Sequence, residues 1–592
     1  MRVVARLVTM AALALSAVGV WAADANKVLH VASQDISGLD PQQISDLYSV
    51  RVAQQIFEGL YEYSYLADPV RVIPNTAAAL PEIGDDGRRW TIRLRKGIRF
   101  SDDPVFEGKP RELVAADYVY ALKRWLDPNL KAGGDATLTD LIVGARAAVD
   151  AARKPGTHFD YDAPIEGLRA IDSHTLEIRL TGVDYTLLER LASWRAFAVA
   201  REVINARGRD TSSWPVGTGP YRLKEWKRGS RIVLEANAHY RALTFPEPVG
   251  PAFAGYAAGM KGVRLPAVGR VEVSIIADEL PVALAFEKGD FDYATVRGIA
   301  STHLLTKGML RPDYAARGIR HIRYPVPALM YTCFNLDDAV VGGSAPDRIA
   351  LRRAIGLGFN VQEYLRVVQG GDGIPATQLL PPGVDGQDAT ADKRALYDPA
   401  AARALLDRFG YVDRDSDGYR ERPDGTPLVL TQNVTSDTRG RETGELWLAS
   451  MKAIGLRIKI NSAPFAELLK QMKAGQLQMF ELGSRSPSPS GFGILMTLYG
   501  KAPRDTNFSR FQSADYDAGY ESFVRTPPGS TRNAIARTMS DVVAAYAPIV
   551  YQAYPVENAF LQPWLNGYYP ASFGFSWKYV DIDLARKRAA RK

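Results

Sequence analysis

The chain contains 592 residues, of which 46% are apolar and 23% charged, and its formal net charge is +7. This length exceeds one hydrophobic core, so we expect two or three lobes, and the apolar content excludes a disordered chain. The excess positive charge lies at the two ends, so the body of the chain is neutral and no nucleic-acid partner is expected. We expect the basic tail, residues 586–592, to be a solvated, frayed end, with weak contact to a membrane surface as the alternative. The end charges are Arg2, Arg6, Arg586, Lys587, Arg588, Arg591 and Lys592.

Residues 1–23 have the three-part layout of a secretory signal peptide. Two arginines precede an apolar run from Leu7 to Val20, and small residues follow it. We expect cleavage after Ala22, Ala23 or Ala25. No cysteine directly follows the run, so we expect no lipid anchor. The alternative is an uncleaved anchor helix, but the run is short for a membrane span.

The first part of the mature chain predicts a mixture of strands and helices. An alternating strand at Val28–Ser33 precedes a helix at Gln43–Leu60, and a second strand at Arg88–Leu94 places Trp90, Ile92 and Leu94 on one face. A helix is expected around Ala115–Leu126. The segment Ile165–Leu180 predicts two strands joined by a turn at Asp172 and Ser173.

The stretch Gly217–Tyr240 predicts a β-hairpin. Its first strand begins at Tyr221, where apolar and basic residues alternate, the turn falls at Lys227–Ser230, and Arg231–Ala236 forms the second strand. A strand at Val271–Ile276 and a helix within Pro281–Tyr293 follow.

The second half of the chain alternates helices with strands, which is typical of a layered α/β lobe. Asp347 is expected to cap one helix, and Asn360 with Glu363 forms a capping box for the next. Proline opens and glycine closes the helix Ala400–Phe409. A helical stripe of apolar residues then ends at Gly455. A strand, a helix and a further strand follow, at 456–460, 464–474 and 476–482.

No pattern of enzymatic residues is visible in the sequence, and we expect neither a catalytic residue nor a cofactor. The six histidines show no metal-ligand spacing, and the His-Glu-x-x-His, Gly-x-Ser-x-Gly and P-loop patterns are absent. Cys333 is the single cysteine, so no intramolecular disulfide can form, and its apolar surroundings predict a buried, inert thiol. A catalytic group assembled only in space stays open, so a secreted hydrolase is the alternative from another functional class.

One acidic loop has the spacing of a calcium-binding loop in its first half. Aspartates alternate with other residues before Gly418. The last position holds aspartate where such loops usually place a bidentate glutamate, and Asp-Gly pairs are common in ordinary turns. Calcium binding and a plain turn are therefore both open. The candidate ligands are Asp413, Asp415, Asp417, Glu421 and Asp424.

Two separated motifs resemble the family 5 extracellular solute-binding proteins, the peptide-binding receptors of ABC importers. The first is Gly-Thr-Gly-Pro-Tyr-x-Leu-x-x-Trp-x-x-Gly, followed by Asn-x-x-Tyr, within Gly217–Tyr240, where Ala238 stands in place of the usual proline. The second is the run Leu80–Arg124, which includes Leu-Arg-x-Gly-Ile-x-Phe-Ser-Asp. The resemblance extends from about residue 28 to residue 580.

The resemblance implies an α/β architecture with the two-lobed periplasmic-binding-protein fold. It further implies mixed sheets, a two-strand hinge and an extra domain inserted in the first lobe. The first lobe is then made of three pieces, and the second lobe is continuous. The expected divisions are lobe I at 24–60, 201–296 and 551–585, the inserted domain at 61–200, and lobe II at 297–550.

The resemblance also implies a function and a set of ligand-binding positions. The protein would be a periplasmic monomer that captures peptides between its lobes and delivers them to ABC permease subunits in the inner membrane. The family often has a tryptophan and an amine-binding aspartate in the loop Gly483–Gly491, but here Ser484 and Pro487 take those places. Two interpretations of Arg485 stay open: it pairs with a carboxylate or phosphate of the ligand, or it is a solvated surface arginine. The positions predicted to contact the ligand are Ser45, Tyr48, Ser484, Arg485, Ser486 and Ser488.

The missing aspartate leaves the identity of the ligand open. Relatives in this family bind metal chelates, haem, sugars or opines, so a non-peptide solute is the alternative within the same importer class. A sensory or chaperone-like binding protein without an importer is a third interpretation.

Overall fold

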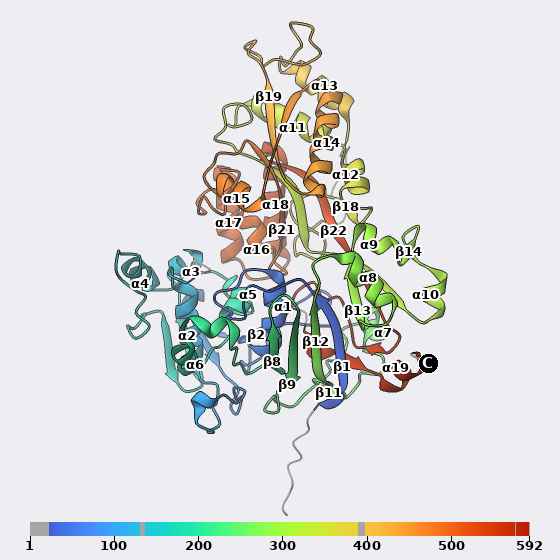
Figure 1. Ribbon diagram of the computed structural model, residues 1–592. Helices are drawn as coiled ribbons and strands as arrows, with labels where there is room; N and C mark the ends of the chain where they lie inside the picture. Colours follow the sequence, from blue (N-terminus) through green and yellow to red (C-terminus); the bar gives the residue numbers. More distant parts are fainter. Residues whose placement is uncertain (1–22, 131–135, 389–396, 575, 591–592) are drawn as a thin grey trace, which may run out of the picture.

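The computed structural model describes residues 23–130, 136–388, 397–574 and 576–590. Figure 1 shows two bodies, one above the other, with a third body beside the lower one. We call the lower body lobe I, the body beside it the inserted domain, and the upper body lobe II. The predicted signal peptide lies almost wholly outside the described residues. Among the described residues, no helix combines the length and the apolar character needed to cross a bilayer.

Lobe I is built on a four-stranded sheet in which the first strand runs parallel to its neighbour and the others are antiparallel. The hairpin predicted at Gly217–Tyr240 is confirmed as β8 and β9. Gly217 and Gly219 lie so close to the backbone of Ile56 that a side chain at either position would clash. In order across the sheet, the strands are β1 (Asp24–Ser33), β12 (Val268–Ile275), β9 (Arg231–Ala236) and β8 (Tyr221–Lys227).

The inserted domain has a four-stranded antiparallel sheet against which helix α2 (Ala115–Leu126) packs. Trp90 and Ile92 of its second strand are buried, as their alternation predicts. The strands are, in order, β4 (Glu82–Gly84), β5 (Arg89–Arg93), β7 (Thr175–Arg179) and β6 (Leu168–Asp172). The helices are α2, α3 (Ala136–Leu141), α4 (Ala145–Ala152) and α5 (Leu187–Leu191), and α6 (Arg201–Arg207) follows them.

Lobe II is a mixed sheet covered by helices, and its long strand β22 (Ile549–Leu561) continues downward to lobe I. The sheet order is β13 (Tyr293–Val296), β22, β17 (Ala328–Phe334), β21 (Met479–Arg485), β19 (Val429–Thr435) and β20 (Arg457–Ala463). Two further strands, β16 (Arg320–Pro325) and β18 (Gly373–Pro375), also pair with β22. The helices include α11 (Pro346–Gly358), α12 (Val361–Val367), α13 (Pro399–Arg408), α14 (Thr438–Ala453), α15 (Phe465–Lys473), α16 (Phe492–Met496), α17 (Ala514–Arg525) and α18 (Ser530–Tyr546).

Two strands connect the lobes. The first part of β22 pairs with β17 in lobe II, while residues 556–561 pair with β16 and residues 558–561 with β13. Strand β16 continues into β17 after Pro325, so the chain crosses once beside this residue and once along β22. This arrangement is the two-strand hinge that the resemblance implies. The exact limits of the predicted domains stay predictions.

The predicted cap Asn360 is confirmed, but the predicted cap Asp347 is wrong, because α11 begins at Pro346 after Ala345 and Asp347 lies in its first turn. The side chain of Asn360 accepts a hydrogen bond from the Glu363 amide, and Asp398 accepts one from the Ala401 amide. The helix predicted at Gln43–Leu60 is shorter, because α1 spans Leu47–Ile56 and begins at its cap, Asp46. Cys333 is buried in β17, and burial raises the pKa of its thiol to about 12, as expected of an inert cysteine.

The expectation of a solvated, frayed tail is wrong in part: residues 586–590 are helical and Lys587 is buried, whereas Arg586 and Arg588 are exposed. Residues 586–590 belong to α19 (Leu584–Ala590), which packs on lobe I near the C-terminus in Figure 1. The ammonium group of Lys587 lies 2.6 Å from Asp292, whose side chain is only 1% exposed. The composition of the tail could not reveal this partner, which precedes it by 295 residues.

Candidate functional site

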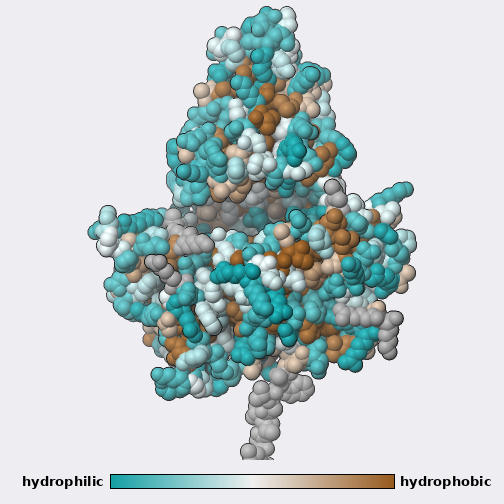
Figure 2. All heavy atoms as spheres, in the orientation of Figure 1, coloured by the Kyte–Doolittle hydropathy of each residue, from teal (hydrophilic) through white to brown (hydrophobic). Residues whose placement is uncertain are grey.

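A cavity of about 380 Å³ lies where lobe I, lobe II and the inserted domain meet. Figure 2 shows the molecular surface hollowed between the upper and lower bodies. Most of the described lining residues come from α1 and the residues after it, the loop at 192–197, β13, the loop after β21, the hinge strands, and the C-terminal loop at 568–578. A solute in this cavity would therefore contact both lobes.

Helix α1 presents one of its faces to the cavity. Leu47, Val50, Arg51 and Gln54 line it at the three- and four-residue spacing that places side chains on one side of a helix. The helix is fixed at its start by Asp46, which accepts hydrogen bonds from the Ser49 amide at 2.7 Å and from the Ser49 hydroxyl at 2.6 Å. These hydrogen bonds, together with one from Ser37, outweigh the effect of burial and lower the pKa of Asp46.

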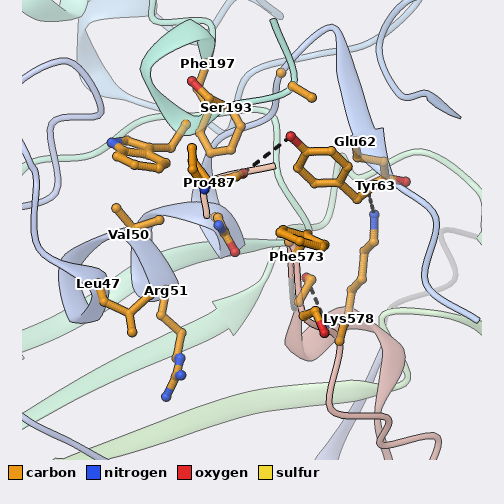
Figure 3. Close-up of a pocket in the computed structure, with 18 of the residues that line it drawn as sticks. Leu47, Val50, Arg51, Glu62, Tyr63, Ser193, Phe197, Pro487, Phe573 and Lys578 are labelled. Carbon is orange, nitrogen blue, oxygen red and sulfur yellow. Dashed lines mark hydrogen bonds and ion pairs between the residues drawn. The ribbon is translucent and has the colours of Figure 1, made fainter. Parts of the chain in front are cut away.

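One end of the cavity is predominantly apolar (Figure 3). The rings of Tyr63 and Phe573 are 5.7 Å apart at their centroids. Val50, Phe197 and Pro487 line the same region. The Tyr63 hydroxyl reaches toward the Pro487 carbonyl at 3.5 Å, which links the inserted-domain side to lobe II. This end can take an apolar or aromatic side chain.

Two acidic residues of the cavity are already neutralised by protein cations. Glu58 accepts from the Arg241 guanidinium at 2.6 and 2.7 Å, and Tyr240 and Thr218 also donate to it. Glu62 pairs with Lys578 at 2.7 Å, as Figure 3 shows. Burial opposes the charge of Lys578, but Glu62 outweighs it and raises the pKa of the ammonium group. These two ion pairs therefore stabilise the wall of the cavity.

Three further charged residues line the cavity at its hinge end, and they have fewer hydrogen-bond and ion-pair partners than Glu58 and Glu62. Arg51 comes from α1, Arg485 from the end of β21 and Glu557 from β22. Arg485 makes one long contact, 3.5 Å, with the Ser572 carbonyl, and Glu557 accepts a hydrogen bond from Tyr324 at 2.7 Å. Within the described part of the chain, the Arg51 guanidinium donates no hydrogen bond that meets normal geometry.

The serine-rich loop after β21 is shaped by its own hydroxyl groups. The Ser486 hydroxyl donates to the Ser488 carbonyl at 2.6 Å, and both side chains are buried. Ser490 donates to Glu189 of the inserted domain. The loop therefore holds Arg485 and Pro487 against the cavity.

Three of the six residues predicted to contact the ligand line the cavity, and three do not. Ser45, Arg485 and Ser486 line the cavity. Tyr48 packs against the core of lobe I, Ser484 pairs with Leu329 within the sheet, and Ser488 is buried beside Ser490, so these three are not among the lining residues. Ligand contact by any of the six stays a prediction. The sequence reasoning missed Arg51, Tyr63, Glu557 and Phe573.

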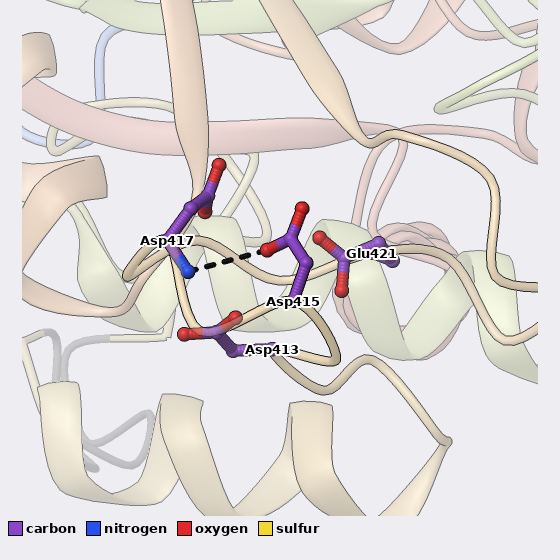
Figure 4. A group of neighbouring side chains, drawn as sticks. All are labelled: Asp413, Asp415, Asp417 and Glu421. Carbon is purple, nitrogen blue, oxygen red and sulfur yellow. Dashed lines mark hydrogen bonds between the residues drawn. The ribbon is translucent and has the colours of Figure 1, made fainter.

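The acidic loop predicted as a calcium site brings four of its five candidates together (Figure 4). Ligand atoms of Asp413, Asp415, Asp417 and Glu421 lie within 4.8 Å of one another, and Asp424 is not part of this group. Asp417 also forms an ion pair with Arg457.

Calcium binding stays a prediction that a melting experiment tests. If these carboxylates bind calcium, the melting temperature rises when calcium replaces a chelator, because a ligand that binds only the folded state stabilises it. The variant Asp413→Asn is the matched control, and it should show a smaller rise. An identical melting temperature in calcium and in chelator would exclude the site.

Comparison with protein families gives a match to the bacterial extracellular solute-binding proteins, family 5 Middle, over residues 71–506. Among curated proteins, the chain is 24% identical over 573 residues to di/tripeptide-binding protein 1 of Pseudomonas aeruginosa, which covers 93% of this chain and 95% of that protein. It is also 24% identical over 567 residues to heme-binding protein A of Haemophilus influenzae, with 94% and 92% covered.

Among solved structures, the fold is similar to the periplasmic binding protein DppA from Helicobacter pylori, which was determined in complex with the peptide STSA. The TM-score is 0.69 at 21% sequence identity, and the match covers 94% of this chain and 98% of that one. This likeness shows the two-lobed α/β fold.

Proposed function

Because this chain belongs to the bacterial extracellular solute-binding proteins of family 5, we propose that it captures short peptides between its lobes for an ABC importer. The observation that carries the proposal is the interlobe cavity with incompletely paired charges of both signs and an apolar end. A zwitterionic peptide presents the same three kinds of group. The volume of the cavity, about 380 Å³, is near the lower limit of ligand pockets, which is about 300–1,000 Å³. A cavity of this size favours short peptides.

Binding and release require no chemical step from the protein. The solute favours the closed arrangement by its differential affinity for that arrangement. No histidine is among the described residues that line the cavity, so its serines have no imidazole base beside them. This composition supports a binding protein over a secreted hydrolase.

Delivery to a membrane permease completes the proposed role. A periplasmic location follows from the predicted signal peptide at residues 1–23 together with the family, and the lobes would act as a monomer. The di/tripeptide-binding relative supports peptides as the solute, whereas the heme-binding relative supports a different solute in the same kind of fold.

Mass spectrometry of the protein purified from its own periplasm tests the proposal. Under native and then denaturing conditions, we expect a heterogeneous set of co-purifying peptides of two or three residues. Calorimetric titration of the ligand-free protein with di- and tripeptides should then give saturable binding. A single non-peptide mass and no binding of any peptide would instead assign a dedicated small-solute importer, and turnover of the peptides would assign a hydrolase.

A further inference from the structure

The charged residues at the hinge end of the cavity have no close ion-pair partner within the described ranges. Of the residues that the structure describes, six charged ones line the cavity, and Glu58, Glu62 and Lys578 among them are matched by close partners. The remaining three are Arg51, Arg485 and Glu557, with a formal excess of one positive charge.

These three side chains influence one another electrostatically but form no direct ion pair among the described residues. Burial opposes the charge of Arg51, yet Tyr293 and then Glu557 outweigh it and raise the pKa of the guanidinium. Desolvation lowers the pKa of Arg485, Glu557 opposes this effect, and the positive charge of Arg51 adds to it. The two guanidinium groups therefore repel each other across the cavity, and Glu557 offsets only part of this repulsion.

The two arginines come from opposite lobes. Arg51 belongs to α1 of lobe I, and Arg485 ends β21 of lobe II. When the lobes approach, the like charges approach too, and an anion between them converts repulsion into attraction. A ligand can shift the equilibrium toward closure only through such a difference between the two states.

Glu557 offers the complementary half of the site. It lies on the hinge strand β22, and among the described residues its carboxylate accepts one hydrogen bond, from the Tyr324 hydroxyl to Oε2. The other carboxylate oxygen is left for a ligand. Position 487, where the family often has an amine-binding aspartate, holds a proline that lines the apolar end instead.

We infer that Arg51 and Arg485 together bind the free carboxylate of a short peptide and that Glu557 binds its free amino group. This inference rests on the proposed function and narrows it to peptides with both termini free. The apolar region around Tyr63, Phe197 and Phe573 then receives a side chain of the peptide. Glu557, on strand β22, would then bind the amino group that the family often binds with an aspartate at position 487.

Calorimetric titration with three forms of one dipeptide tests the inference. The probes are Ala-Phe, its C-terminal amide and its N-acetylated form. Because each modification removes a charge-assisted hydrogen bond, worth about 1.5–3 kcal/mol, we expect each to weaken binding about 10- to 100-fold. The acid-to-amide ratio is the affinity for Ala-Phe divided by the affinity for its C-terminal amide, and it should fall toward one in Arg51→Ala and Arg485→Ala. The amine-to-acetyl ratio is the affinity for Ala-Phe divided by the affinity for its N-acetylated form, and it should fall toward one in Glu557→Gln.

Arg366→Ala is the matched control, because Arg366 forms an exposed pair with Glu363 and is not among the residues that line the cavity. It should keep both ratios. Equal binding of Ala-Phe and its amide by the wild-type protein overturns the inference but leaves peptide binding intact. If neither Ala-Phe nor any other unmodified di- or tripeptide binds, the proposed function itself fails, and the inference fails with it. The wild-type ratios need no variant, so a variant that does not fold cannot decide the outcome.

Discussion

Replacing Asp292 by asparagine is expected to lower the free energy of unfolding by about 3–5 kcal/mol, the typical effect of breaking a buried ion pair. The carboxylate is buried and accepts from three donors: the Lys587 ammonium at 2.6 Å, the Trp564 indole at 2.6 Å and the His30 amide at 2.7 Å. An asparagine cannot neutralise Lys587, so the variant leaves a positive charge without a partner next to the core of lobe I. Urea denaturation followed by tryptophan fluorescence measures the change.

The control for this prediction is Asp313→Asn, which breaks the exposed pair of Asp313 with Arg311. Exposed pairs contribute about 0–1 kcal/mol, so this variant should unfold almost as the wild type does. Deletion of residues 586–592 should resemble Asp292→Asn, because it removes Lys587 and leaves Asp292 buried. A change below 1 kcal/mol in both Asp292→Asn and the deletion would show that the helix α19 adds little to stability.

Replacing Glu189 by glutamine is expected to weaken peptide binding about a hundredfold while leaving the cavity lining unchanged. Glu189 lies on α5 of the inserted domain and accepts from Ser490 and from Arg532 of lobe II, at 3.3 Å in the second case. Its partner Arg532 is buried, with two of its nitrogens unbonded among the described residues. Glutamine cannot neutralise this guanidinium, so the contact between the inserted domain and lobe II loses its ion pair and the open arrangement becomes favoured.

Small-angle scattering and calorimetry separate this effect from misfolding. A loss of about 3 kcal/mol in the closed arrangement corresponds to roughly a hundredfold in apparent affinity, and the radius of gyration should rise in the absence of ligand. Glu521→Gln is the control, because Glu521 pairs with Lys501 within lobe II. Unchanged affinity in Glu189→Gln would show that this interlobe pair does not contribute to closure.

Apolar periodicity and capping residues, which are local features of the sequence, predicted most of the helices and strands. Helix α2 has the limits expected from sequence, Ala115–Leu126, because apolar periodicity and its neighbours define it without distant partners. Asp398 and Pro399 likewise define the start of α13. The predicted helix Gln43–Leu60 exceeds α1 at both ends, and at its start the physical reason is the cap Asp46, a residue type preferred at that position.

The candidate site was predictable only in part, since its residues come from distant segments. Arg485 was identified because it lies in a loop that the resemblance marks as binding. Glu557 had a weak signal, a single acidic residue within the otherwise mostly apolar strand Ile549–Leu561. The sequence could not show that Glu557 lies near Arg51, because that proximity depends on how β22 passes between the lobes.

The position of Glu557 on the shared strand also bears on the kinetics of capture. A residue at a pivot is displaced least when the bodies on either side rotate, so Glu557 keeps its place whether the molecule is open or shut. A peptide amine can dock on it before rotation begins, and Arg485, carried by the moving lobe, engages afterwards. Substitutions at Glu557 should then alter the association rate, whereas substitutions at Arg485 should alter mainly the residence time of the peptide.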